Sequence, residues 1–490
     1  MNFWTADTIR DATQGRWLSR PRTERGIERL TTDSRDAGPM AAFVALKGET
    51  TDGHLHVLQA AEAGAPVVVI HTEAAATVAV RELTAVLLVG DTGAALLRLA
   101  AAYRRHLEGT RVIAVGGSNG KTTTVRLIDS VLSTELRGSA SKKSFNNAVG
   151  VPLTILSAKK GDQYLICEVG TNAPGEIAPL IDVIRPDVAV LTSIGREHLE
   201  GLGSLDGVIR EEVTVLSGLK PGGLAVLPAD TPQLRPAVRR LGTNGMKTIW
   251  FGTAADADLR VSDARTTLSG TTFTLNGREE LRIPLFGVHN ATNAAAAVAV
   301  ARRLGIGEAS IARGLAGAEG PPMRMQRAVL DGPDGPIIFI NDAYNANPDS
   351  MMRSFETFFV MAAAAAAERV VLVLGDMLEL GTHGPLLHLE VVRAAREHLS
   401  TLKSPWLLVL VGPLMMKAGE DLPDENTHAV ESLRGEQAAL AAAWLKAGDL
   451  VLLKGSRGTG VERIFEACGL ANRDGLKAGL RERSDERRVE

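Results

Sequence analysis

The chain has 490 residues, enough for about three domains of ordinary size. Apolar residues make up 45% of it and charged residues 23%, as in other globular proteins. The formal net charge is −3, and the chain has no long basic run. Nucleic acids are bound largely through lysines and arginines that neutralise phosphates, so this charge balance argues against a nucleic-acid partner.

The cysteines and the apolar segments bear on the cellular compartment. The two cysteines, Cys167 and Cys468, are too few for a disulfide framework, which predicts free thiols in a reducing environment. Residues 1–20 lack the apolar core of a signal peptide, and no apolar stretch approaches the ~18–20 residues of a membrane span. We therefore expect a soluble, cytoplasmic protein, with a monomer as the default state.

The first part of the chain has the pattern of an α/β unit. Short apolar runs predict buried strands at 43–46, 67–70 and 86–89, and helical patterns separate these runs. We assign residues 1–108 to an N-terminal α/β domain.

The next part, 109–320, is predicted to form a central domain with a mainly parallel sheet. Continuous apolar runs are typical of strands buried on both faces, and they occur at 112–115, 164–169 and 188–191. A glycine-rich turn follows the first strand, and a helix is expected from about Thr122 to Leu136. Residues 259–285 alternate polar and apolar side chains, which predicts an antiparallel insertion or edge, and Asn290–Leu304 predicts an alanine-rich helix.

Gly320, Pro321 and Pro322 mark a linker, because proline cannot continue a helix. After this linker, four apolar runs separated by helical patterns predict a second βαβ-type domain with strands at 337–340, 370–374, 406–411 and 450–453. We assign residues 321–471 to this C-terminal domain. The remaining segment, 472–490, is charged and without apolar periodicity, and we expect it to be disordered.

A phosphate-binding loop is predicted where the central domain's first strand meets its first helix. The loop consists of Gly117, Ser118, Asn119, Gly120, Lys121, Thr122 and Thr123. Glycines let backbone N–H groups close around phosphate oxygens, and the helix N-terminus favours negative charge. Lys121 can pair with the β- and γ-phosphates, and Thr122 can offer a hydroxyl to Mg²⁺. Val115 replaces the first glycine of the standard spacing, and the alternative is a turn that only connects strand and helix.

Two residues near strand ends are candidates for a metal site. Glu168 ends the predicted strand 164–169, beside the phosphate loop in a parallel sheet, where a carboxylate is well placed to hold Mg²⁺. His198 follows the strand 188–191 at a short distance in sequence. A single histidine is more often structural than functional, so the residues alone leave both roles of His198 open.

A third candidate lies on the segment Ser204–Leu219, which is predicted to be a helix with Ser204 as its N-cap. Glu212 falls in the middle of the helix's apolar face, where a carboxylate is costly unless it is paired with a cation or a metal. A structural ion pair is the alternative. The polar residues on the other faces are expected to be solvated, namely Arg210, Glu211 and Thr214.

These motifs, taken in order, resemble the Mur ligase family. The resemblance runs from about residue 30 to 465, and the ordered set is highly specific although each motif is short. It is carried by Thr32–Arg35, Phe43–Gly48, Asp52–His54, Gly117–Thr123, Ser144–Asn147, Gly150–Thr154, Glu168–Asn172, Pro174–Ile177, Gly287–Asn290 with Asn293, Asn341–Met351, Gly375–Gly381 and Lys454–Arg457. The resemblance implies a three-domain α/β fold: an N-terminal UDP-binding domain, a central P-loop ATPase domain and a C-terminal Rossmann-like domain.

The activity implied by the resemblance is ATP-dependent amide-bond formation in cell-wall synthesis. The residues are most similar to members that add D-alanyl-D-alanine to UDP-N-acetylmuramoyl-tripeptide through an acyl phosphate. The implied catalytic residues are Lys121, Glu168, His198, Glu212 and Arg324. The implied Mg²⁺ ligands are Thr122, Glu168, His198 and Glu212. The implied ATP-binding residues are Gly117–Thr123, Asn290, Asn293, Arg324 and Asp342; among them, Asn290 and Asn293 belong to the motif that contacts adenine, and Asp342 would bind ribose.

The resemblance also implies two groups of residues that bind the other substrates. The N-terminal group would bind the UDP-sugar: Ser34, Arg35, Lys47, Asp52 and His54. The remaining substrate-binding residues are Asn146, Asn147, Thr171, Asn172, Tyr344, Asn345 and Asn347. Arg324 would reach the phosphates from the C-terminal domain, so catalysis would depend on closure of that domain.

The chain departs from the family at Glu212, where most members carry a lysine whose carbamylated amine binds the second Mg²⁺. The family's usual glutamate two residues later is Thr214 here. Our hypothesis is that Glu212 replaces the carbamylated lysine, directly or through a bridging water. A misaligned helix or a weakened second metal site is the alternative.

Two other functions are compatible with this departure. One is a diverged ligase that acts on a different carboxylate or amine, which the retained UDP-site motifs argue against. The other is an inactive nucleotide-binding regulator, which retention of Lys121, Thr122, Glu168 and His198 argues against.

Overall fold

The computed structural model describes residues 3–20, 26–48, 51–72, 84–142, 144–242, 245–332 and 334–468. Within these residues the chain forms three separate sheets, one in each predicted domain, and the predicted α/β fold is confirmed. The segment 472–490, which was expected to be disordered, lies outside the described residues. In the described ranges, no helix combines the length and the apolar character needed to cross a lipid bilayer.

The N-terminal sheet has the strand order β1-β5-β4-β3-β2, with β1 antiparallel to β5 and the other pairs parallel. The predicted strands correspond to β3, β4 and β5; β4 has the predicted bounds, whereas β3 is shifted by two residues and β5 by one. Its elements are α1 (Ala6–Thr13), β1 (Arg16–Ser19), β2 (Arg29–Thr31), β3 (Ala41–Val44), α2 (Val57–Glu62), β4 (Val67–Ile70) and β5 (Ala85–Leu88), with short 3-10 helices at Ser34–Asp36 and Gly53–His56.

The central sheet has the strand order β14-β13-β12-β11-β10-β9-β6-β8-β7. The strands from β7 to β12 run parallel, and the predicted antiparallel segment forms β12, β13 and β14 at one edge. The strands are β6 (Arg111–Gly116), β7 (Gly138–Ala140), β8 (Tyr164–Glu168), β9 (Val188–Leu191), β10 (Leu224–Pro228), β11 (Lys247–Gly252), β12 (Leu259–Thr267), β13 (Gly270–Leu275) and β14 (Glu279–Ile283).

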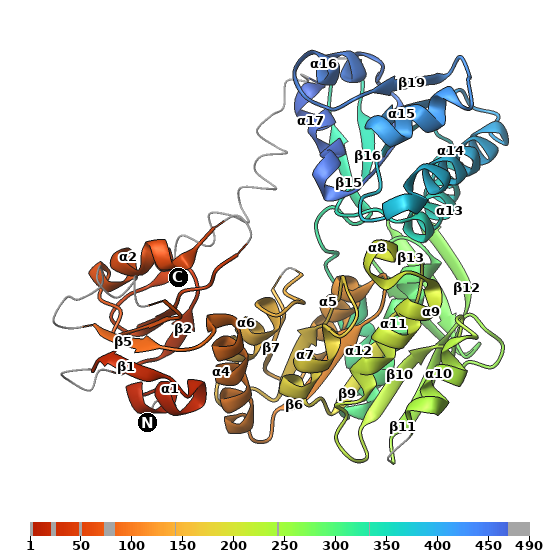
Figure 1. The fold of residues 1–490 in the computed structure, drawn as a ribbon. Coiled ribbons are helices and arrows are strands. Elements are labelled where there is room, and N and C mark those ends of the chain that lie inside the picture. Colours follow the sequence, from red (N-terminus) through yellow and green to blue (C-terminus); the bar gives the residue numbers. More distant parts are fainter. Residues whose placement is uncertain are drawn as a thin grey trace.

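Helices cover both faces of the central sheet, as continuous apolar strands require. Ile113 and Val115 of β6 face one apolar cluster, whereas Val112 and Ala114 face the other. The helices are α4 (Thr92–His106), α5 (Lys121–Leu132), α6 (Gly150–Ser157), α7 (Ile177–Ile184), α8 (Leu199–Leu202), α9 (Leu205–Glu212), α10 (Leu234–Leu241), α11 (Val288–Arg303) and α12 (Glu308–Ala316), with a 3-10 helix at Val213–Leu216. Helix α4 packs against α1 of the N-terminal domain and against α6 and α7, so it joins the two domains (Figure 1).

The C-terminal sheet has the strand order β15-β16-β20-β17-β18-β19, with only β15 antiparallel to its neighbour. Its strands are β15 (Gln326–Leu330), β16 (Ile337–Asp342), β17 (Arg369–Gly375), β18 (Trp406–Val411), β19 (Thr427–Val430) and β20 (Asp449–Lys454). Its helices are α13 (Pro348–Ala365), α14 (Gly384–Ser400), α15 (Pro413–Glu420), α16 (Gly435–Ala443) and α17 (Ile464–Ala467), with 3-10 helices at Gly381–His383, Arg457–Thr459 and Val461–Arg463.

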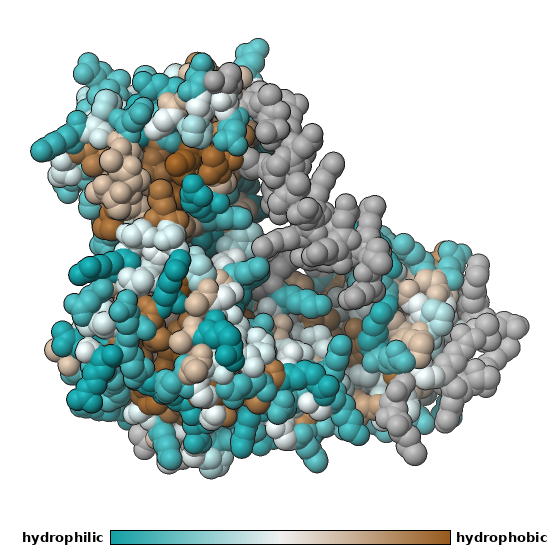
Figure 2. Space-filling model, turned by 180° about the vertical axis from the view of Figure 1, so that it is seen from behind, coloured by the Kyte–Doolittle hydropathy of each residue, from teal (hydrophilic) through white to brown (hydrophobic). Residues whose placement is uncertain are grey.

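The C-terminal domain lies over one end of the central domain, whereas the N-terminal domain stands to one side (Figure 1). Seen from behind, the junction between the central and C-terminal domains is a band of mainly pale and teal residues. Brown apolar residues gather above and below it (Figure 2).

Two predicted helices differ from the structure. The helix expected at 122–136 is α5, which already ends at Leu132. The helix expected at 204–219 begins as predicted, with the Ser204 hydroxyl accepting from the Gly207 N–H, but it continues after Glu212 only as a 3-10 helix. The prediction that Glu211 is solvated was wrong. Its carboxylate is buried and accepts hydrogen bonds from the N–H groups of Gly175 and Ile177, at the start of α7.

Candidate functional site

A cavity of about 950 Å³ opens between the central and C-terminal domains. Most of the residues predicted to bind ATP or substrate in these two domains line it, although they come from segments far apart in sequence. They are Ser118, Asn119, Gly120, Lys121, Thr123, Asn146, Glu168, Asn172, His198, Asn290, Asn293, Arg324, Asp342, Tyr344, Asn345 and Asn347.

The predicted phosphate loop connects β6 to α5 and forms part of the cavity wall. Gly117 and Gly120 have φ values of +113° and +88°, which only glycine adopts without strain. A Cβ atom at Gly117 would also lie 2.5 Å from the Thr192 hydroxyl, and one at Gly120 would lie 2.9 Å from the Asn293 amide. The backbone can therefore approach a ligand closely here because both positions are glycine.

Lys121, the first residue of α5, folds back over the loop. Its ammonium group donates to the carbonyl of Ser118 at 3.1 Å and to the carbonyl of Gly117, and it lies 3.8 Å from Oε1 of Glu197. These contacts hold a positive charge at the cavity wall, next to the N-terminus of α5. A phosphate group placed there would meet both the lysine and the helix N–H groups.

Three buried carboxylates surround this lysine: Glu168 at the end of β8, Glu212 at the end of α9, and Glu197 between β9 and α8. In each, one oxygen is buried without a hydrogen-bond partner, namely Oε2 of Glu168, Oε1 of Glu197 and Oε1 of Glu212. Burial raises the pKa of all three carboxyls, that of Glu197 to about 8, and the negative charge of Glu212 adds to this shift. One lysine does not balance three acids, so negative charge is in excess beside the phosphate loop.

Glu168 and Thr122 have the chemistry expected of Mg²⁺ ligands. The Asn146 amide donates to Oε1 of Glu168 at 3.1 Å, and the other oxygen has no partner. Burial raises the pKa of Glu168, while the charge of Lys121 and the nearby Thr122 hydroxyl act in the opposite direction. A carboxylate oxygen and a threonine hydroxyl at the start of the phosphate-loop helix therefore lie side by side, and both are oxygen ligands of the kind Mg²⁺ prefers.

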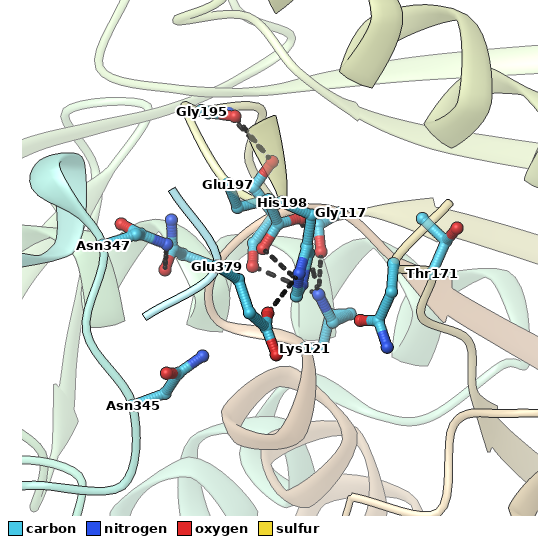
Figure 3. A network of polar contacts seen from close by, with 12 residues as sticks. Gly117, Lys121, Thr171, Gly195, Glu197, His198, Asn345, Asn347 and Glu379 are labelled. Atoms are coloured by element: carbon cyan, nitrogen blue, oxygen red, sulfur yellow. Dashed lines mark hydrogen bonds and ion pairs between the residues drawn. The ribbon is translucent and has the colours of Figure 1, made fainter. Parts of the chain in front are cut away.

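His198 lies at the boundary between the two domains. Its Nδ1 is 2.7 Å from Oε2 of Glu379, which reaches in from the C-terminal domain (Figure 3). Burial lowers the pKa of His198, and Glu379 partly offsets this effect. The described residues contain no group of three His, Cys, Asp or Glu side chains arranged to hold a metal by themselves, so any cation at His198 would need further ligands.

Glu212 does not line the cavity but lies behind the phosphate loop. It is fully buried, and its Oε2 accepts a hydrogen bond of 2.6 Å from the N–H of Gly117. A Cβ atom on the neighbouring Gly116 would lie only 3.0 Å from the same oxygen. Glu212 thus fixes the first glycine of the loop, and its unpartnered Oε1 is a free acceptor.

The C-terminal domain contributes Arg324 through a short segment with unusual backbone geometry. Met323 and Met325, on either side of it, have φ values of +59° and +51°. The Arg324 guanidinium lies 4.3 Å from the centre of the Tyr344 ring, a cation–π contact. Met325 is fixed by a hydrogen bond of 3.0 Å from its N–H to Oδ1 of Asp342.

Asp342, predicted to bind ribose, lines the cavity but already has protein partners on both oxygens. Its Oδ2 accepts a hydrogen bond from the Ser354 hydroxyl at 2.6 Å and pairs with the Lys454 ammonium at 2.8 Å. Lys454 is buried and also lines the cavity. Asp342 therefore supports the segment that carries Arg324, in addition to facing the cavity.

The residues predicted to contact adenine form one side of the cavity. Asn290 and Asn293 are buried in the first turns of α11, where the Asn293 amide donates to Oδ1 of Asn290 at 3.1 Å. Asn293 lies directly behind Gly120, so it joins this side of the cavity to the phosphate loop. His289 precedes them and lines the cavity as well.

His289 should make the stability of the protein depend on pH. Burial lowers its pKa from about 6.5 to about 4, with the charge of Arg353 adding to the shift. Between these values the unfolded chain binds a proton that the folded chain does not, so stability is full above pH 6.5 and falls towards pH 4. We expect His289→Gln to reduce the drop in melting temperature between pH 7 and pH 5, whereas His56→Gln, at an exposed position, should leave it unchanged.

Several predicted substrate residues are used partly within the protein. Asn347 is the N-cap of α13, and its amide also donates to Oδ1 of Asn119 at 3.2 Å. The Tyr344 hydroxyl donates to the Ser144 hydroxyl at 2.8 Å. Asn147 and Thr171 do not line the cavity, and their side chains bond to the backbone of their own turns.

The N-terminal residues predicted to bind the UDP-sugar form a separate group outside the cavity. Arg35 pairs with Asp33 at 2.6 Å, and the Ser34 hydroxyl donates to Gln59. His54 is buried, with Nδ1 2.7 Å from Asp52 and Nε2 accepting from the N–H of His71. Both ring nitrogens of His54 are therefore occupied. Lys47 forms an isolated backbone bridge with Asp52.

The sequence analysis did not single out Arg196, Glu197, Glu379 and Lys454, although all four lie at or beside the cavity. Glu197 could have been found from the sequence, because it directly precedes the candidate metal ligand His198 and places a carboxylate in the same segment. Glu379 and Lys454 were noted only as parts of longer motifs. Their contacts join segments far apart in sequence, which no local pattern reveals.

Comparison with known protein families gives a match in each of the three domains. Residues 26–104 match the description "Mur ligase family, catalytic domain", residues 115–301 match "Mur ligase middle domain", and residues 323–457 match "Mur ligase, glutamate ligase domain".

Named relatives and solved structures extend this match. The chain is 36% identical over 455 residues to UDP-N-acetylmuramoyl-tripeptide–D-alanyl-D-alanine ligase of Bacillus subtilis, covering 92% of this chain and 95% of that one. It is 33% identical to the enzyme of the same name from Escherichia coli, over 76% of this chain and 79% of that one. A crystal structure of MurF from Acinetobacter baumannii superposes with a TM-score of 0.81 at 31% identity, covering 94% and 98% of the two chains. MurF of Thermotoga maritima in complex with ADP has a TM-score of 0.75 at 25% identity, covering 90% and 96%.

A phosphate loop in a mainly parallel sheet, facing a second α/β domain across a polar cavity, defines a nucleotide-binding enzyme with several domains. With matches to all three family descriptions and relatives above 30% identity over most of its length, the chain belongs to the Mur ligase family.

Proposed function

We propose that this chain is the ATP-dependent ligase that joins D-alanyl-D-alanine to UDP-N-acetylmuramoyl-tripeptide. The observation that carries the proposal is the cavity itself. In it the phosphate loop of the central domain faces the segment Asn341–Ser350 of the C-terminal domain, the segment most typical of this ligase. The relatives with this activity align over nearly the whole chain. We place the reaction in the cytoplasm, where ATP is available, and expect a monomer.

The reaction proceeds in two steps. A carboxylate oxygen of the tripeptide attacks the γ-phosphorus of ATP, the bond to ADP breaks, and an acyl phosphate forms. The amine of D-alanyl-D-alanine then attacks the acyl carbon, an amide bond forms, and inorganic phosphate leaves with the loss of one proton from the amine. Phosphoryl transfer of this kind depends mainly on positioning and charge neutralisation.

Residues from both domains would supply that neutralisation. Lys121 and the N–H groups of the loop would bind the phosphates from the central domain, and Arg324 would approach them from the C-terminal domain. Asn290 and Asn293 would contact the adenine, and Asp342 would bind the ribose. Arg324 and Lys121 line the same cavity, which supports a single phosphate site between them.

Two magnesium ions would be held by the acidic cluster. Thr122 and Glu168 would hold the first, and His198 would hold the second with Glu212 behind it. When bound, the ions would neutralise charge on the transferred phosphoryl group. Support comes from the unpartnered oxygens of Glu168 and Glu212 and from the excess of acid around one lysine.

The substrates would enter from both sides of the central domain. The N-terminal residues Ser34, Arg35, Lys47, Asp52 and His54 would form the UDP-sugar site. Four residues beside the phosphate loop would contact the peptide, namely Asn146, Asn147, Thr171 and Asn172. The C-terminal residues Tyr344, Asn345 and Asn347 would face the incoming dipeptide.

A coupled assay of phosphate release tests this function. We expect phosphate release from ATP only when both UDP-N-acetylmuramoyl-tripeptide and D-alanyl-D-alanine are present. Mass spectrometry should then detect a product heavier than the tripeptide nucleotide by the mass of two alanine residues. Release that needs a different acid or amine would identify a diverged ligase. Binding of ATP without release under any of these conditions would identify an inactive nucleotide-binding protein.

Glu212 provides a separate prediction about the second cation. Glutamine at this position keeps an oxygen for the Gly117 N–H but removes the negative charge. We expect Glu212→Gln to raise the Mg²⁺ concentration needed for half-maximal activity about tenfold, since one charge-assisted contact is lost, with little change in melting temperature. Glu212→Ala should also lower the melting temperature, because a buried N–H loses its partner.

The same experiment separates Glu212 from a carbamylated lysine. Added bicarbonate should leave the activity of the unmodified protein unchanged, because a glutamate already carries its carboxylate. A Mg²⁺ response in Glu212→Gln that equals that of the unmodified protein would restrict Glu212 to holding the phosphate loop.

A further inference from the structure

The loop Ser193–His198 lies between the phosphate loop and the C-terminal domain, and it contacts both. On one side, the N–H of Ser118 donates to the Ser193 carbonyl at 2.7 Å, and the N–H of Asn119 donates to the Ser193 hydroxyl at 3.2 Å. The N–H of Gly195 donates to the Ser118 hydroxyl at 2.9 Å. The shape of the phosphate loop therefore depends on where this loop sits.

On its other side, the same loop is held by two acidic residues of the C-terminal domain through Arg196. Asp349, in the first turn of α13, accepts from the Arg196 N–H at 2.6 Å and pairs with its guanidinium at 3.0 Å. Glu390, on α14, pairs with the same guanidinium at 3.2 Å. A Cβ atom at Gly195 would lie 2.7 Å from Asp349, so the two domains approach closely here.

Arg196 does not line the cavity, although its neighbours Glu197 and His198 do. Because Arg196 does not face the cavity, it can affect the reaction only through other residues and not by touching ATP or substrate. The His198–Glu379 pair, two residues further along the same loop, also joins the two domains (Figure 3). Arg196, Asp349 and Glu390 thus form a polar contact between the two domains that lies outside the cavity.

We propose that Arg196, Asp349 and Glu390 form a clasp that couples docking of the C-terminal domain to the geometry of the phosphate loop. Arg196 is a positioning residue: when the C-terminal domain docks, Asp349 and Glu390 fix Arg196, Arg196 fixes the loop Ser193–His198, and that loop fixes Ser118 and Asn119. By linkage, nucleotide binding at the phosphate loop favours the docked arrangement to the same degree. The inference rests on the proposed function only for its effect on turnover.

The test compares Arg196→Met with a matched control, Arg302→Met. Arg302 also bridges two carboxylates in the central domain, at 2.7 Å to Glu279 and 2.9 Å to Glu308, but both partners belong to the central domain itself. We expect Arg196→Met to weaken binding of a non-hydrolysable ATP analogue about fivefold by calorimetry and to lower kcat about tenfold. Small-angle X-ray scattering should show a larger radius of gyration with the analogue bound. Arg302→Met should change none of these quantities.

Glu390→Gln provides a milder variant, since Glu390 is about half exposed and its substitution should leave the fold intact. It should weaken nucleotide binding less than Arg196→Met, and the double variant should be no weaker than Arg196→Met alone, because Glu390 acts only through Arg196. Additive effects in the double variant, or unchanged nucleotide affinity and scattering in Arg196→Met, would overturn the clasp. If the unmodified protein shows no ligase activity while binding and scattering respond as expected, the clasp stands and the proposed function fails.

Discussion

Lys121→Met is expected to reduce the ligase rate about a thousandfold, which is the size of effect seen when a group that neutralises transition-state charge is removed. Lys121 provides the positive charge that the phosphate loop holds in place through its own carbonyls. Methionine fills a similar space without charge, so the γ-phosphate would lose its main partner from the central domain. Phosphate release with saturating substrates measures the effect.

The loss should be specific to this lysine. Lys160→Met, at an exposed position in the same domain, should keep the full rate. The Lys121→Met protein should still melt cooperatively, because the lost ammonium group contacts the loop and Glu197 at the cavity wall and not the apolar core. A rate within tenfold of the unmodified protein would mean that the phosphates are neutralised elsewhere, and the assignment of this loop would be wrong.

Glu168→Gln is expected to reduce the rate at least about a hundredfold and to abolish its response to Mg²⁺. Glutamine keeps an acceptor for the Asn146 amide but removes the carboxylate proposed to bind the first cation. The same substitution should raise the stability of the metal-free protein, although it lowers the rate. Burial raises the pKa of Glu168, so its ionised form is unfavourable in the folded protein without a cation, and Glu168→Gln should melt slightly higher in the absence of Mg²⁺.

Glu211→Gln is the matched control, because Glu211 is a buried glutamate in the same domain that holds two N–H groups and does not line the cavity. It should lower the melting temperature and leave the Mg²⁺ response unchanged. If Glu168→Gln kept its Mg²⁺ response, the first cation would have to be held by another residue of the cluster.

Much of the architecture follows from local pattern. Apolar runs such as 188–191 and 406–411 became strands with the predicted bounds, because strands buried on both faces must be apolar throughout. Strands β1, β2, β7, β10, β11, β15 and β19 were not predicted. Of these, β7, β15 and β19 are short or partly exposed edge elements. An edge strand pairs on one side only and is partly exposed, so it needs no continuous apolar run and its own residues carry a weak signal.

In the site, too, some residues could be predicted from local pattern and others could not. The phosphate loop could be predicted because its glycines, lysine and threonine are consecutive, and the conformation they need is a property of those few residues. The burial of Glu212 was predicted, but its neighbour Glu211 was expected to be solvated and is buried as well. One holds the start of α7 and the other holds Gly117, and only the packing of α9 decides which carboxylate faces which backbone.

The sequence by itself thus determined the class of fold, the position of the phosphate loop and the identity of many polar residues at the cavity. Each of these depends on short-range spacing or on an ordered set of motifs. Only the tertiary structure decided that Glu197 joins the acidic cluster, that Lys454 supports Asp342, and that Arg196 connects two domains. The reason is physical: the burial and pairing of a charged side chain depend on what packs against it, and here those partners come from distant parts of the chain.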